Sequence, residues 1–134
     1  MQEQFPRPLP QPNPDTQPYW DAAKQDKLVV QHDPKSGRHQ HPPKPHMDGC
    51  GFDFEWKELK GTGTVYSYTV IYPPVHPAFE PPYGIALVVP DDAPDVRIMA
   101  DIKGVDLEKL EIGMPVKVQF ETVEDITFPY WVPA

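Results

Sequence analysis

Apolar residues alternate with polar residues, or run together, in five short stretches after Gly61: residues 62–72, 83–89, 96–102, 116–120 and 126–132. Alternation with a period of two, enriched in β-branched and aromatic residues, is typical of half-buried strands, so we predict five strands. Between the third and fourth stretches, Asp106 can cap a single helical turn that carries Leu107 and Leu110 and ends at Gly113. Five strands with this interruption predict a mostly β protein with an OB-fold, a small Greek-key barrel, over residues 58–134.

A short helix is predicted near the start of the chain. Asp15 or Thr16 can cap it, and Pro18 lies in its first turn, where a missing N–H costs nothing. Its apolar side consists of Tyr19, Trp20, Ala22 and Ala23. We expect this helix within residues 15–27, ending near Asp26.

The segment that precedes this helix is rich in proline. Five of the 20 prolines alternate with other residues there, namely Pro6, Pro8, Pro10, Pro12 and Pro14. This spacing blocks a helix and favours an extended polyproline-type tail over residues 1–14. Because few apolar side chains there can be buried, we expect a flexible leader, and an arm that wraps a partner subunit is the alternative.

Two short strands are predicted between the helix and the barrel. Residues 28–31 form one apolar run, and Phe52, Phe54 and Trp56 alternate with acidic residues in the other. We expect the two strands to pair as the base of a hairpin whose tip contains Pro42, Pro43 and Pro45. Burial of Met47 with the three aromatic residues would then hold this segment together.

The hairpin segment has the spacing of a zinc ribbon without its cysteines. Its two turns are Asp33-x-x-Ser36-Gly and Met47-x-x-Cys50-Gly, where a zinc ribbon has C-x-x-C-G. A serine hydroxyl stays protonated near neutral pH and a thioether is a poor zinc ligand, so only Asp33 and Cys50 retain anionic donors. We expect a degenerate zinc ribbon over residues 28–57, with vestigial ligand positions and no zinc.

The order and spacing of these segments resemble the "domain of unknown function 35" family along nearly the whole chain. The matching pieces are residues 18–23 (PYWDAA), 28–31 (LVVQ), 37–45 (GRHQHPPKP), 63–70 (GTVYSYTV) and 112–116 (IGMPV). The resemblance implies an N-terminal helix, a rubredoxin-like zinc ribbon and a C-terminal OB-fold. It also implies a partner, because members of this family mostly accompany thiolase-like enzymes that make or break carbon–carbon bonds in acyl-CoA substrates. The lost cysteine quartet is the main departure from the family pattern.

Charge and composition limit the possible functions. A net charge of −8 and a pI near 4.9 argue against a nucleic-acid groove, which needs clustered basic residues. Tyr66, Tyr68 and Tyr72 could stack on bases, so a nucleic-acid-binding OB-fold protein remains an alternative. The longest apolar run, residues 85–89, is too short to span a bilayer, and no apolar run follows a basic N-terminal region. We expect a cytoplasmic protein that binds neither membrane nor nucleic acid.

No catalytic residue can be assigned from the sequence. Cys50 and His76 are the two candidates for a stand-alone acyl-CoA hydrolase, which is a further alternative, but no nucleophile and base are paired in a recognisable motif. A metal site rebuilt from the histidines of the ribbon segment and Cys50 is also open. These histidines are His32, His39, His41 and His46.

The resemblance therefore implies a non-catalytic accessory subunit of a thiolase-like enzyme, either a thiolase or a retro-aldolase, that acts on an acyl-CoA. Such a carbon–carbon lyase or acyltransferase complex would act in steroid side-chain or aromatic acyl-CoA degradation. We expect a hetero-oligomer in which this chain binds no cofactor of its own and shares the CoA thioester with its partner.

Two segments are predicted to contact the CoA or the partner. One is the hairpin tip, where Arg38 and Lys44 flank Pro43 and could meet phosphates. The other is the Pro-rich connection over residues 73–82, which offers Val75, His76 and Phe79. Long loops held by proline lose little entropy on docking, so they are common contact surfaces.

Overall fold

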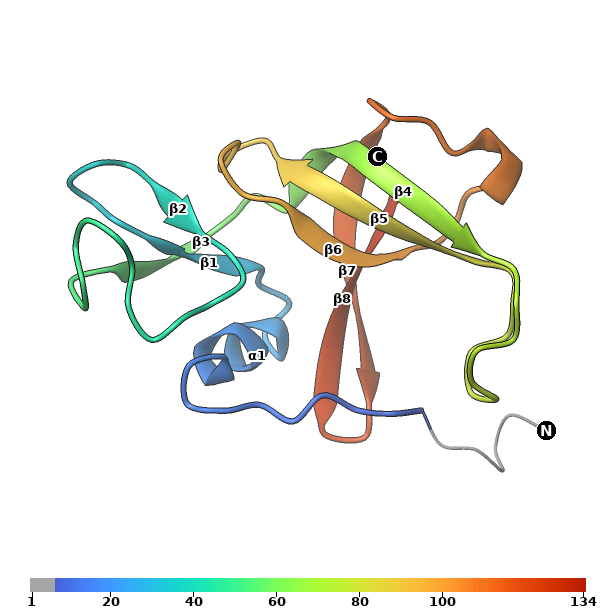
Figure 1. The fold of residues 1–134 in the computed structure, drawn as a ribbon, viewed down its shortest axis with the longest axis horizontal. Coiled ribbons are helices and arrows are strands. Elements are labelled where there is room, and N and C mark those ends of the chain that lie inside the picture. The colour runs from blue at the N-terminus through green and yellow to red at the C-terminus, as the bar shows by residue number, and fades with distance from the viewer. Residues whose placement is uncertain (1–6) are drawn as a thin grey trace.

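The computed structural model describes residues 7–134 and shows a closed five-stranded barrel beside a three-stranded sheet (Figure 1). The barrel strands, in the order β4-β5-β6-β8-β7, are β4 (Thr62–Ile71), β5 (Tyr83–Pro90), β6 (Ile98–Ile102), β7 (Pro115–Val123) and β8 (Ile126–Pro133). Neighbouring strands are antiparallel except β6 and β8, which pair in parallel where Ile102 faces Trp131. The predicted five-stranded OB-fold is confirmed.

The 3-10 helix η2 (Leu107–Lys109) lies between β6 and β7, as predicted. The Asp106 side chain caps it by accepting a hydrogen bond from the Glu108 backbone N–H at 3.1 Å. Leu110 follows the helix and is buried in the barrel core. This turn therefore closes one end of the barrel with an apolar side chain.

The barrel encloses a continuous apolar core. Its most deeply buried side chains are Trp131, Ile98, Val65, Val88 and Val116. Along β5, which was predicted from a continuous apolar run, every second residue is buried, because successive side chains of a strand point to opposite faces. Gly63 allows β4 and β5 to approach each other closely, since a Cβ at this position would lie 2.6 Å from the Val89 carbonyl oxygen.

The three-stranded sheet has the order β2-β1-β3, with β1 (Val29–His32), β2 (His39–Gln40) and β3 (Glu55–Glu58) all antiparallel. We call residues 29–58 the three-stranded unit. The prediction that Phe52 begins the last strand is wrong, because β3 starts at Glu55 and the Phe52 side chain is 79% exposed. A turn through Cys50 and Asp53 places Phe52 at a corner that faces solvent. Met47, by contrast, is buried as expected.

Helix α1 (Gln17–Ala23) contacts both β1 and β8, so it lies between the two sheets (Figure 1). Thr16 occupies the capping position, but the capping side chain is that of Asn13, which accepts from the backbone N–H groups of Asp15 and Thr16 at 2.9 and 3.0 Å. The helix ends at Ala23, earlier than predicted. Asp26 then adopts a left-handed φ of 59° in the turn that leads to β1.

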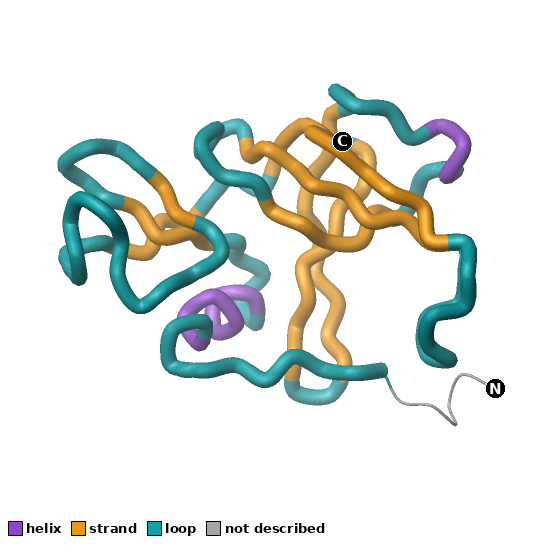
Figure 2. The backbone as a smooth tube through the Cα atoms, in the orientation of Figure 1, coloured by secondary structure: helices purple, strands orange, loops and turns teal. Residues whose placement is uncertain are grey.

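Residues 7–12 run without regular structure beside the β7–β8 hairpin (Figure 2). The first six residues of the predicted Pro-rich tail lie outside the described residues. Within the described part the tail is anchored, because the Arg7 guanidinium lies 4.0 Å from the centroid of the Phe128 ring. The flexible leader stays a prediction. No helix in residues 7–134 has the length and apolarity needed to cross a membrane.

Candidate functional site

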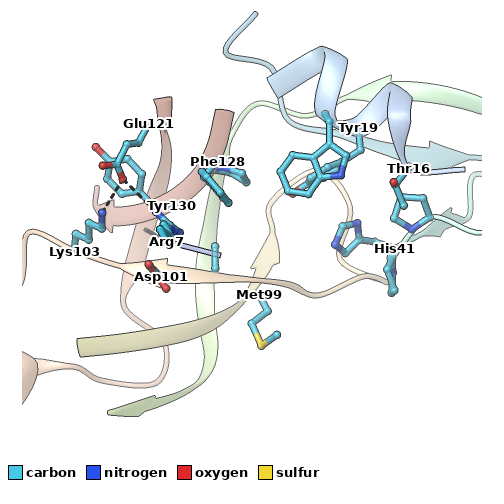
Figure 3. A pocket seen from close by; sticks show the side chains of 15 residues that line it. Arg7, Thr16, Tyr19, His41, Met99, Asp101, Lys103, Glu121, Phe128 and Tyr130 are labelled. Atoms are coloured by element: carbon cyan, nitrogen blue, oxygen red, sulfur yellow. Dashed lines mark hydrogen bonds and ion pairs between the residues drawn. The ribbon is translucent and has the colours of Figure 1, made fainter. Parts of the chain in front are cut away.

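A pocket of about 350 Å³ lies where the tail, α1, the hairpin tip and the barrel meet (Figure 3). Its walls come from segments far apart in the sequence: Arg7 from the tail, Tyr19 and Trp20 from α1, His41 to Pro43 from the tip, and residues of β6, β7 and β8. We call it the helix–barrel pocket. Pockets at the junction of structural units are common places for ligands and partners.

A series of ring contacts, which we call the aromatic track, forms one side of this pocket. His41 lies 5.5 Å from Tyr19, Tyr19 lies 5.3 Å from Trp20, and Trp20 lies 6.1 Å from Phe128, all measured between ring centroids. The edge-to-face angles of 86° and 81° at Trp20 are the favourable geometry for such rings. The aromatic track therefore joins the hairpin tip to the barrel through α1.

Arg7 extends the aromatic track to the Pro-rich connection over residues 73–82, which we call the long loop. Its guanidinium lies 4.0 Å from the Phe128 ring centroid and 5.6 Å from the Phe79 ring centroid. A smaller hollow on the far side of Arg7, about 190 Å³, is lined by Ala78 and Phe79. Four residues line both spaces: Arg7, Asp101, Lys103 and Glu121. The hairpin tip and the long loop thus lie at the two ends of one continuous depression.

The two cations in this depression share one carboxylate, that of Glu121. Glu121 accepts from Lys103 at 3.0 Å and lies 4.0 Å from Arg7, and Lys103 also lies 4.8 Å from the Tyr130 ring centroid (Figure 3). A phosphate would have to compete with Glu121 for both cations. The depression is better suited to an apolar or aromatic group bordered by polar contacts than to an isolated anion.

Burial sets the protonation of two groups in the aromatic track. Desolvation lowers the pKa of His41 to about 4, and it raises the pKa of Tyr19 above its ordinary value. Both rings are therefore neutral near pH 7. The His41 Nδ1 atom is buried and has no hydrogen-bond partner among the described residues.

The predicted contact residues at the hairpin tip separate into two groups. Pro43 lines the helix–barrel pocket, whereas Arg38 and Lys44 are exposed and do not belong to the pocket lining found among residues 7–134. The Arg38 guanidinium instead packs beside Gly49 of the second turn, 3.6 Å from where a Cβ would stand. The basic groups that do line the depression are Arg7 and Lys103, which the sequence did not single out.

The three residues predicted on the long loop have different environments. Val75 is 63% exposed, whereas Phe79 is partly buried between Arg7 and Tyr83, 6.1 Å from the latter ring. His76 packs 5.5 Å from Phe79, and its Nδ1 accepts a hydrogen bond from the Ala78 N–H at 3.0 Å. Because that nitrogen already accepts a hydrogen bond inside the loop, His76 acts as a loop-stabilising side chain.

The positions predicted to be vestigial ligands lie in two tight turns, each ending at a glycine. Gly37 and Gly51 have left-handed φ angles of 80° and 63°, which suit glycine. In the first turn the Ser36 hydroxyl donates to Asp33 Oδ2 at 2.7 Å, and the Lys35 N–H donates to Oδ1 at 3.0 Å. These hydrogen bonds, from Ser36 first, lower the pKa of Asp33. A hydrogen-bonded carboxylate thus holds the first turn.

The donors at these positions do not fit zinc. Met47 is buried, the Ser36 hydroxyl is already engaged, and the pKa of the Cys50 thiol is raised by burial and by the carboxylates of Asp33 and Asp53. A raised pKa keeps the thiol protonated and makes it a poor ligand and nucleophile. Within residues 7–134 no three His, Cys, Asp or Glu side chains gather as a metal-binding group.

A buried glutamine, which sequence analysis missed, holds the hairpin tip in place. Gln31 is fully buried, and its amide nitrogen donates to the Lys44 carbonyl at 2.7 Å. Its amide oxygen accepts from the Lys44 N–H at 3.1 Å and from Gln40 Nε2 at 2.7 Å. The only sequence signal was a polar residue at an inward position of a predicted strand.

A second polar cluster joins the three-stranded unit to the barrel. Asp95, in the loop before β6, accepts from the His39 backbone N–H and from its ring Nδ1, both at 2.7 Å. The other ring nitrogen of His39 lies 3.2 Å from Lys57 Nζ, which also donates to the Asp92 carbonyl. His39, one of the histidines of the possible rebuilt metal site, is therefore used to join the two sheets.

The family model described as "ChsH2, C-terminal OB-fold domain" matches residues 56–121. Among curated proteins, a "Probable enoyl-CoA hydratase alpha subunit" of Thermomonospora curvata is 42% identical over 130 residues, which are 96% of this chain and 40% of that protein. The "3-oxo-4,17-pregnadiene-20-carboxyl-CoA hydratase alpha subunit" of Mycobacterium tuberculosis is 31% identical over 120 residues, 89% of this chain and 38% of that protein. The chain thus spans about 40% of the length of these relatives.

Two solved structures share the fold. A DUF35-family protein of unknown function from Sulfolobus solfataricus matches with a TM-score of 0.64 at 19% identity, over 91% of this chain and 87% of that one. A structure described as "Ltp2-ChsH2(DUF35) aldolase" matches with a TM-score of 0.85 at 40% identity, over 93% of this chain and 98% of that one. This identity over almost the whole of a DUF35 chain shows that the protein belongs to the DUF35 family, as its sequence indicated.

Proposed function

We propose that this chain is a non-catalytic accessory subunit, or the corresponding part of one, in a heteromeric enzyme that acts on an acyl-CoA. The observation that carries this proposal is the extended match to the Ltp2–ChsH2 aldolase structure. The partner would be a thiolase-like subunit that performs the carbon–carbon chemistry. The curated relatives named for steroid-derived and enoyl-CoA substrates support an acyl-CoA of this type.

The candidate catalytic residues support an accessory role. The raised pKa of Cys50 disfavours a thiolate, and His76 is engaged with its own loop. The chain's share of the function would be to shape the substrate entrance of the partner and to hold part of the CoA thioester. We propose that it binds no cofactor of its own.

The three-stranded unit, in this proposal, is a zinc ribbon that has lost its metal. The Asp33–Ser36 hydrogen bond, which lies within the first turn, and the buried Gln31 network, which joins β1 to the hairpin tip, support this interpretation, because both order the unit through protein groups alone. Such a unit keeps a rigid hairpin tip at the entrance of the helix–barrel pocket without depending on metal supply.

Co-expression with a thiolase-like aldolase subunit from the same host tests this function. We expect a stable hetero-oligomer by size-exclusion chromatography with light scattering, and acyl-CoA cleavage that requires both chains. The chain alone should leave acyl-CoA thioesters intact. Acyl-CoA hydrolysis by the chain alone, abolished by Cys50→Ser, would overturn the accessory role and favour the hydrolase alternative.

A further inference from the structure

The tail over residues 7–12 is held on the protein by side-chain contacts alone. Its residues make no hydrogen bond within residues 7–134. Where the tail joins α1, Asn13 fixes the backbone by accepting from the N–H groups of Asp15 and Thr16. At the other end Arg7 makes the specific contacts, with two aromatic rings and one carboxylate. The tail is therefore tethered at Asn13 and bound at Arg7.

The site that receives Arg7 consists of Phe79, Phe128 and Glu121, and we call it the arginine clamp. The guanidinium lies 5.6 Å from the Phe79 ring centroid. It lies 4.0 Å from the Phe128 ring centroid and 4.0 Å from Glu121 Oε2 (Figure 3). Asp101 lines the hollows on both sides of Arg7, so a second carboxylate borders the clamp. Two ring faces beside carboxylates suit a planar guanidinium better than a compact ammonium group.

The tail presents one side to the protein and another to solvent. Pro8 and Gln11, three positions apart, are exposed, whereas the other four residues are partly buried: Arg7, Leu9, Pro10 and Pro12. A repeat of three residues is that of the polyproline II helix, an extended conformation whose backbone has no internal hydrogen bonds. Proteins recognise such segments through their side chains, in grooves lined by aromatic residues. The tail thus lies on the protein in the manner of a bound proline-rich peptide.

We propose that the arginine clamp is a peptide-binding site whose ligand is an arginine on an extended, proline-rich segment. The chain's own tail occupies this site in cis. The chemistry of the two sides is complementary, because the clamp offers ring faces and the carboxylates of Glu121 and Asp101, and the ligand offers a guanidinium. The site does not depend on the proposed enzyme partner.

Occupation by the tail controls access to the clamp. Arg7 lies between the helix–barrel pocket and the smaller hollow, and it lines both. When Arg7 leaves, the two spaces join and the ring faces of Phe79 and Phe128 become accessible to another ligand. Because the tail is tethered at Asn13, its arginine is present at a high effective concentration, and a peptide in solution must compete with it. The tail therefore inhibits the site to which it is bound.

An acetylated peptide that copies residues 7–14 tests the site in trans. Full-length Arg7→Ala has a vacant clamp and should bind this peptide, whereas the wild type should bind it about threefold more weakly or worse, because its own arginine competes. A peptide with alanine in place of the arginine should bind Arg7→Ala about tenfold more weakly, and a lysine peptide should lie between the two. Arg97→Ala is the matched control, since Arg97 lies 3.9 Å from the Tyr66 ring centroid, outside the depression, and its removal should leave peptide binding at the wild-type level.

NMR titration of the isotope-labelled chain measures each Kd and maps the perturbed amides, which should lie in the β7–β8 hairpin and the long loop. Circular dichroism confirms that each variant is folded. Equal Kd values for the arginine and alanine peptides, no binding by Arg7→Ala, or equal binding by Arg7→Ala and the wild type would overturn the clamp. Binding by Arg97→Ala as tight as that by Arg7→Ala would show a general effect of lost positive charge and would also overturn it. The proposed accessory function stands or falls separately, by the co-expression experiment.

Discussion

The barrel and the three-stranded unit are stabilised by different kinds of interaction. The barrel encloses Trp131, Ile98 and their neighbours in an apolar core, and its strands are long. The three-stranded unit has strands of at most four residues, and its buried side chains include the polar Gln31 and Asp33. Burial of apolar surface therefore holds the barrel, whereas hydrogen bonds to specific partners hold the three-stranded unit.

This difference bears on the expectation that the three-stranded unit holds no zinc. A small unit cannot bury enough apolar surface to order itself, and zinc is one common solution. Here the hydrogen bonds of Gln31 and Asp33 hold the turns, and the His39–Asp95 pair attaches the unit to the barrel. Its stability thus depends on the barrel beside it.

The largest effect should come from the barrel core. Trp131→Ala should lower the free energy of unfolding by about 3–5 kcal/mol, because it removes a fully buried ring and leaves a cavity. Urea unfolding followed by circular dichroism measures this loss. Trp131→Phe is the control: it keeps a ring and removes an indole N–H that has no partner among the described residues, so it should cost less. Equal losses in the two variants would contradict a packing origin.

A smaller and more local effect is expected in the three-stranded unit. Gln31→Ala should cost about 1–3 kcal/mol, because it removes three hydrogen bonds and leaves backbone groups of Lys44 without partners. Hydrogen exchange should show faster opening of residues 29–58 with the barrel amides unchanged. Gln119→Ala, at an exposed position of β7, is the matched control. Uniform loss of protection in both regions would remove the distinction between them.

The same difference decides what the sequence could predict. Strand periodicity identified all five barrel strands and the turn capped by Asp106, because apolar alternation is a local signal of burial. It did not identify Gln31 or Arg7, since the partner of Gln31 is a carbonyl thirteen residues away and the partner of Arg7 is a ring on β8. The aromatic track was missed for this reason, and Phe52 was expected to be buried because its turn was not recognised. Asn13 was missed because Asp15 and Thr16 were equally suitable capping residues in the sequence.

Acid should weaken the attachment between the two regions. Burial raises the pKa of Asp95, but the hydrogen bonds from His39 outweigh it, so the net pKa lies below the ordinary value of about 3.8. A lowered folded-state pKa stabilises the fold above the unfolded-state pKa, and this stabilisation is lost as the pH falls through the folded-state value.

Asp95→Asn should therefore cost less than about 1 kcal/mol at pH 7, a modest value because the carboxyl is partly exposed. The cost should become smaller as the pH falls below about 3.8 and through the lowered pKa of Asp95, because the wild-type carboxyl then also becomes protonated. Urea midpoints at pH 7 and along an acid series measure this change, with Asp125→Asn in the exposed β7–β8 turn as the control. A cost that does not change with pH would show that the Asp95 charge contributes nothing to the attachment.

The smallest effect is expected at Cys50, one of the positions predicted to be a vestigial zinc ligand. Structural zinc contributes about 10–16 kcal/mol of apparent binding energy in small domains, and it does so through thiolate or imidazole donors. In this chain Cys50 is the one cysteine, burial and nearby carboxylates raise the pKa of its thiol, and Ser36 already donates to Asp33. Cys50→Ser should therefore change the free energy of unfolding by less than about 0.5 kcal/mol, in the range of substitutions that break no specific interaction.

Treatment of the wild type with a chelator should leave its unfolding curve and circular dichroism unchanged. About one zinc per chain by elemental analysis, together with a chelator-induced loss of stability that Cys50→Ser reproduces, would show that the three-stranded unit depends on a metal after all.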